Sequence, residues 1–94
     1  MTVWIKQGVL GELQPIARKG LGRLALLADS KNEDLFITSL REGNHSAGSL
    51  HYEGWAFDLH KLKLTTITEC RSALGPGWDI VNEYDHWHFE YDPR

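Results

Sequence analysis

Residues 86–91 read His86-Trp87-His88-Phe89-Glu90-Tyr91, a segment in which polar and aromatic side chains alternate strictly. Successive side chains of a β-strand point to opposite faces, so this segment predicts a strand with one polar and one aromatic face. Residues 55–59, Trp55-Ala56-Phe57-Asp58-Leu59, repeat the alternation and place Asp58 opposite the large apolar residues. Together the two segments predict a sheet with a core on one side and acidic and imidazole groups on the other.

The segments around these two strands predict two helices and two further strands. Helical periodicity runs from Pro15 to Ala28, and Thr65 or Thr66 can cap a short helix that ends at Leu74, before Gly75-Pro76-Gly77. Residues 35–39 and 79–82 are predicted strands, and residues 29–34 and 41–49 are predicted loops. We therefore expect one α+β domain over residues 1–94, with a small antiparallel sheet, helices on one face and a metal site on the other.

Composition narrows the classes of function. The formal net charge is -3 and the basic residues are scattered, which argues against nucleic acid as a partner. Cys70 is the single cysteine, so no internal disulfide can form. The N-terminal residues do not have the pattern of a signal peptide, and no apolar run is long enough to span a membrane. We expect a monomer that is synthesised in the cytoplasm without a signal peptide and has no membrane partner.

A potential metal site lies in two segments near the C-terminus. His51 and Asp58 can converge from a loop and the strand that follows it, and Gly54 permits a sharp turn between them. Two imidazoles and one carboxylate suffice for a catalytic zinc, which keeps a fourth position for water. Spacing alone does not choose between His86 and His88 as the second imidazole, and both can bind one metal from the same strand face.

Metal-assisted hydrolysis also needs a base beside the water and a group that stabilises the oxyanion. Asp85 and Glu83 are both close enough in sequence to serve as the base, and Asp85 is the closer of the two. Arg41 follows a predicted strand and precedes the His51 loop, so its guanidinium is the candidate for the oxyanion. The alternative interpretation is an ordinary hydrogen-bonded pair of His51 and Asp58, with a structural role for the histidines.

The paired motifs resemble the zinc D-Ala-D-Ala carboxypeptidase family, which includes L-alanyl-D-glutamate endopeptidases of phage lysins and shares the Hedgehog fold. The family signature S-x-H-x6-D matches Ser49, His51 and Asp58, with Gly54 and Ala56 also in place. In the second signature an acid stands three residues before the last ligand histidine, and here these positions are Asp85 and His88, with His86 as an additional histidine. Residues 36–41 are similar to the family strand that ends in S-G-Y-R, shortened by one residue.

The resemblance implies roles for these residues. One Zn²⁺ would be bound by His51, Asp58 and His88, with Asp85 as the base. His86 would assist the transition state and Ser49 would contact substrate. The implied function is hydrolysis of an amide bond in peptidoglycan peptides, and the compact form without a leader suits a phage-associated protein released at lysis. The rival expectation is a non-catalytic zinc-containing binding module of the same fold.

Overall fold

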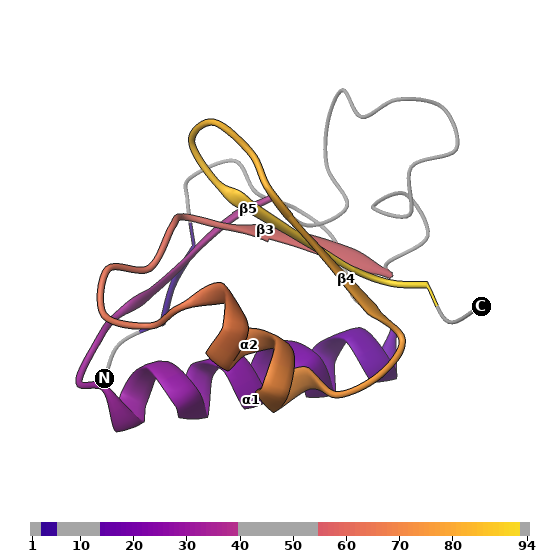
Figure 1. The fold of residues 1–94 in the computed structure, drawn as a ribbon, viewed down its shortest axis with the longest axis horizontal. Helices are drawn as coiled ribbons and strands as arrows, with labels where there is room; N and C mark the ends of the chain where they lie inside the picture. The colour runs from indigo at the N-terminus through magenta and orange to yellow at the C-terminus, as the bar shows by residue number, and fades with distance from the viewer. Residues whose placement is uncertain (1–2, 6–13, 40–54, 93–94) are drawn as a thin grey trace.

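The computed structural model describes residues 3–5, 14–39 and 55–92, and within these it shows an α+β fold. Five strands form one sheet: β1 (Val3–Ile5), β2 (Leu35–Ser39), β3 (Ala56–Leu59), β4 (Trp78–Asn82) and β5 (Trp87–Tyr91). Two helices, α1 (Pro15–Ser30) and α2 (Ile67–Leu74), both lie on the same side of this sheet (Figure 1). The expected arrangement of helices on one face is therefore observed.

The order of the strands is β1-β2-β3-β5-β4, which places β3 in the middle. The pairings of β2 with β3, β3 with β5 and β5 with β4 are all antiparallel, as predicted. The difference is β1, which the sequence did not predict and which pairs with β2 in parallel. The sheet is therefore mixed. A three-residue strand carries too little alternation to be recognised in a sequence.

Side chains on the helix side of the sheet form the core. Phe57 of β3 stacks on Phe89 of β5 with ring centroids 5.2 Å apart, and its ring lies 5.7 Å from that of Trp78. Leu59 and Trp87 are buried beside them. The aromatic face predicted from the alternation of residues 86–91 is thus the face that packs on the helices.

Helix α1 contacts this core mainly through small residues. Its buried positions are the small residues Ala17, Gly20 and Ala28 together with Leu24, whereas Leu27 is only partly buried. At Gly20 an added Cβ would lie 2.3 Å from the nearest ring atom of Trp78, so only glycine permits this approach of helix to sheet.

The second helix begins where the sequence predicts. Thr66 is the N-cap residue, and a capping box forms because Thr66 Oγ1 accepts from the Glu69 amide at 3.1 Å and Glu69 Oε1 accepts from the Thr66 amide at 3.0 Å. Gly75 ends the helix with φ of 82°, a conformation that favours glycine. Among the described residues, neither helix is long and apolar enough to cross a membrane.

Candidate functional site

The candidate site lies on the sheet face opposite the helices. Asp58 of β3 is paired in register with His88 of β5 and with Ser39 of β2, so all three strands contribute to one row. The register between β2 and β3 shifts between Ile37 and Ser39, an irregularity of the kind that re-aims a side chain at the end of a strand. The row therefore begins at Ser39, passes through Asp58 and reaches His88.

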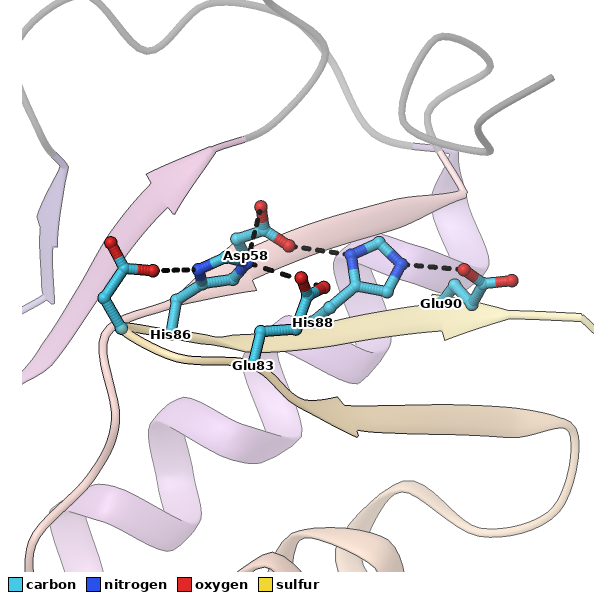
Figure 2. Close-up of polar contacts among 6 residues, drawn as sticks. Asp58, Glu83, His86, His88 and Glu90 are labelled. Atoms are coloured by element: carbon cyan, nitrogen blue, oxygen red, sulfur yellow. Dashed lines mark hydrogen bonds and ion pairs between the residues drawn. The ribbon is translucent and has the colours of Figure 1, made fainter. Parts of the chain in front are cut away.

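His88 is held between two carboxylates. Its Nδ1 lies 2.8 Å from Asp58 Oδ1, and its Nε2 lies 2.7 Å from Glu90 Oε1 (Figure 2). The side chains of His88 and Asp58 are only 14% and 10% exposed, so neither ring nor carboxylate is free to reorient in solvent. The predicted ligands Asp58 and His88 are thus adjacent, and both belong to well-paired strands.

These contacts change the pKa of His88. Burial by itself lowers the pKa of an imidazole, because it disfavours the charged ring. The hydrogen bonds to Asp58 and Glu90 and the charges of these carboxylates outweigh burial, and the pKa is raised to about 9. In the absence of a cation, His88 is therefore an imidazolium at neutral pH.

His86, Asp85 and Glu83 lie together in the turn between β4 and β5. The Glu83 amide donates to the His86 carbonyl at 3.0 Å, which closes the turn. His86 Nδ1 lies 2.6 Å from Asp85 Oδ1, and its Nε2 is 3.6 Å from both Asp58 Oδ2 and Glu83 Oε1. The sequence predicted a strand from His86 onward, which is wrong at this residue: β5 begins at Trp87, because His86 completes the turn.

The two candidate bases differ in position. The Asp85 side chain is 79% exposed and lies on the Nδ1 side of the His86 ring, while Glu83 is 44% exposed and lies on the Nε2 side. Figure 2 shows Asp58 and Glu83 on the same side of the ring. The turn at Tyr84-Asp85 brings both carboxylates to His86.

A pocket of about 460 Å³ opens beside this cluster. The described residues that line it come from the end of β2, from β3 and from the turn: Thr38, Ser39, Asp58, His60, Asp85 and His86. Its volume lies within the range of small-molecule sites, which is roughly 300–1,000 Å³. The predicted site residues Arg41, Ser49 and His51 lie outside the described residues.

Two features of the site were not predicted as such. Glu90 lies outside both motifs, and its Oε1 lies 2.7 Å from His88 Nε2. A group of three carboxylates, Asp79, Glu90 and Asp92, has ligand atoms that all lie within 4.8 Å of one another and could hold a metal ion, although exposed acidic groups often gather without one. The pairing of Asp79 with Glu90 across β4 and β5 explains the cluster, and this register is not evident from the sequence.

The cluster around His86 and His88 is rich in carboxylates. Four carboxylates, those of Asp58, Glu83, Asp85 and Glu90, surround two imidazoles through contacts of 2.6 to 3.6 Å. Even with one ring protonated, this group carries excess negative charge, which a divalent cation compensates. Imidazole nitrogen and carboxylate oxygen are also ligand types that Zn²⁺ takes. Comparisons with protein-family models, curated proteins and solved structures found no match to this chain.

Proposed function

We propose that this chain is a zinc-dependent metallopeptidase that hydrolyses an amide bond in peptidoglycan peptides. The observation that carries the proposal is the placement of Asp58 and His88 at directly paired positions of β3 and β5, with their side chains 2.8 Å apart. These are two of the three residues that the sequence motifs assign as ligands, and they lie 30 positions apart in the chain. The third, His51, is assigned by the motif alone.

The proposed ligands would be His51, Asp58 and His88, one carboxylate and two imidazoles. When bound, Zn²⁺ would act as a Lewis acid that polarises the scissile carbonyl and makes a water molecule nucleophilic near neutral pH. His88 must lose its proton to become a ligand. The neighbouring carboxylates keep the negative charge that favours a dication at this position after the proton has left.

Asp85 is the proposed general base, acting together with His86. The 2.6 Å contact between Asp85 Oδ1 and His86 Nδ1 fixes the ring and directs Nε2 toward Asp58. Asp85 would accept the proton of the attacking water and return it to the leaving amine, and His86 would assist the transition state. Glu83 is the alternative base, because its Oε1 lies 3.6 Å from His86 Nε2.

The substrate would occupy the pocket beside the turn. Thr38 and Ser39, which both carry hydroxyl groups, line its β2 side. Ser49 is proposed to contact the substrate and Arg41 to stabilise the oxyanion, both from the resemblance of the motifs. The peptidoglycan substrate class also comes from that resemblance, and the D-Ala-D-Ala and L-Ala-D-Glu bonds are the two candidates.

One observation favours a second function, that of a non-catalytic binding module. His88 already has a carboxylate on each ring nitrogen, and among the described residues no buried side-chain polar atom lacks a hydrogen-bond partner. A network that is complete without a metal can serve as a structural element. Such a module would keep the same residues and bind a peptide without cutting it.

The test combines zinc content with turnover. Purified wild-type protein would be analysed for metal and then incubated with synthetic muropeptides containing each of the two candidate bonds. Asp85→Asn and Glu83→Gln form a matched pair, because each removes one carboxylate beside His86. We expect one zinc per chain in all three proteins and a loss of turnover in Asp85→Asn of roughly 10²–10⁴-fold.

The possible results separate the two functions and the two bases. Full activity of Asp85→Asn together with an inactive Glu83→Gln would transfer the role of base to Glu83. Zinc binding without cleavage of either peptide would favour the binding module. A protein that takes up no zinc would refute the metallopeptidase, and the histidines would then be structural.

A further inference from the structure

We propose that Glu90 is a positioning residue that selects which nitrogen of His88 faces the metal. This inference rests on the proposed function and goes beyond it, because Glu90 belongs to neither sequence motif. Its carboxylate lies 2.7 Å from His88 Nε2, while Nδ1 of the same ring lies 2.8 Å from Asp58 (Figure 2). Glu90 therefore holds the ring nitrogen that points away from the proposed co-ligand.

A neutral imidazole has one N–H and one lone pair, so it can donate to only one of its two carboxylates. If the proton is on Nε2, it is donated to Glu90 and the lone pair on Nδ1 is available beside Asp58. If the proton is on Nδ1, it is donated to Asp58 and the lone pair on Nε2 is directed at Glu90. A metal bound at that nitrogen would lie away from Asp58, the other proposed ligand. Ligation by His88 and Asp58 together therefore requires the first tautomer, which Glu90 stabilises.

The position of Glu90 in the sheet explains why its carboxylate turns toward His88. The two residues alternate on β5 and so share one face of the strand. The partner of Glu90 on β3 is Ala56, which is small and offers no charge, and its partner on β4 is Asp79, a second acid. Asp92 is also close, and repulsion from these two carboxylates leaves the His88 ring as the favourable neighbour.

The experiment measures zinc affinity in the full chain by competition with a chelator of known affinity. Glu90→Ala removes the acceptor, Glu90→Gln keeps an amide oxygen that can accept the Nε2 proton, and the control Asp29→Asn removes an exposed charge on α1, on the helix side of the sheet. We expect Glu90→Ala to bind zinc roughly 10- to 100-fold more weakly than wild type, since this is the usual effect of losing such a partner. Glu90→Gln should lose less, and Asp29→Asn should stay close to wild type.

A second readout, which a general loss of stability would not change, is the protonation pattern of the His88 ring. Long-range ¹H–¹⁵N spectra of the zinc-loaded wild type should show the proton on Nε2 and the metal on Nδ1. Thermal unfolding of each variant without metal verifies that it is folded. The reverse pattern in the wild type would overturn the assignment of Glu90, even if affinity falls in Glu90→Ala.

The failure of this inference differs from the failure of the proposed function. A wild type that binds zinc, with Glu90→Ala equally tight, would overturn the positioning role alone. Equal losses in Glu90→Ala and Asp29→Asn would also overturn it, because the effect would then be one of general charge. A wild type that binds no zinc would overturn the proposed function and the inference together.

Discussion

Metal-free protein should lose stability as the pH rises from 6 to 9, because of the proton on His88. Its pKa is raised in the folded chain to about 9, from an ordinary value of 6.5. The folded state therefore holds this proton more tightly than the unfolded state. The contribution to stability is complete below the unfolded pKa, decreases as the pH rises, and is lost above the folded pKa.

The size of the effect follows from the shift. One pKa unit corresponds to about 1.4 kcal/mol, so a rise from 6.5 to about 9 contributes about 3 kcal/mol to the free energy of unfolding. The side chain is 14% exposed, so screening by solvent reduces this value only modestly. A domain of this size has a total stability of about 5–15 kcal/mol, so the loss would be a substantial fraction of it.

Urea unfolding in the presence of a chelator, at several pH values between 6 and 9, measures this contribution. The matched variant is His88→Gln, which cannot titrate, and the quantity of interest is the stability of wild type minus that of the variant. Subtraction removes the effects of other groups, including the Cys70 thiol. A difference that stays constant within about 0.5 kcal/mol over this range would refute the assignment of His88 as an imidazolium between two carboxylates.

Three further predictions concern the scaffold. Gly20→Ala should destabilise the protein by about 1–3 kcal/mol in urea unfolding, because the added Cβ would meet the Trp78 ring. Gly22→Ala is the control and should be neutral or stabilising, since a Cβ there would have nothing within 4 Å. Equal effects of the two substitutions would contradict the close approach of α1 to Trp78. Glu33 accepts from the amides of Lys63 and Leu64 and from Thr65 Oγ1, so Glu33→Gln should cost about 1–3 kcal/mol, while Lys63→Gln, which keeps its amide, should have little effect on the same measurement. Cys70 is buried, and its pKa is raised to about 11 by burial and by the charges of Glu69 and Glu33. Its thiol should therefore react with Ellman's reagent only in denaturant. Rapid reaction of the native protein would show that the core around Cys70 opens to solvent.

Much of the fold could be predicted because local signals and packing agree. Alternation in residues 86–91 and 55–59 identified two strands and their buried faces, and Thr66 with Glu69 identified the start of α2. The buried face of α1 is not decided by helical periodicity alone. Its contact surface depends on how closely Trp78 approaches Gly20, and this distance between segments is set by tertiary packing.

The sequence indicated which residues belong to the candidate site, but not how they contact one another. The motifs identified Asp58, Asp85 and His88, but they did not show that His86 lies in the turn or that Glu90 binds His88. Both depend on the register between strands, which the alternation of one strand cannot fix. The roles of Arg41, Ser49 and His51 stay predictions, because these residues lie outside the described part of the chain.

The order of the strands separates two kinds of residue in the site. Asp58 and His88 lie on β3 and β5, each of which has a paired strand on both sides. Amides in such strands exchange with solvent only when a large part of the domain opens, whereas residues 83–86 lie outside the paired strands and can open locally. Asp58 and His88, two of the groups proposed to hold an ion, thus belong to backbone paired on both sides, whereas Asp85 and His86, proposed to act on protons, belong to the less protected turn. Substitutions in the turn can therefore alter proton transfer without loosening the hold on the ion, so the two properties can evolve separately.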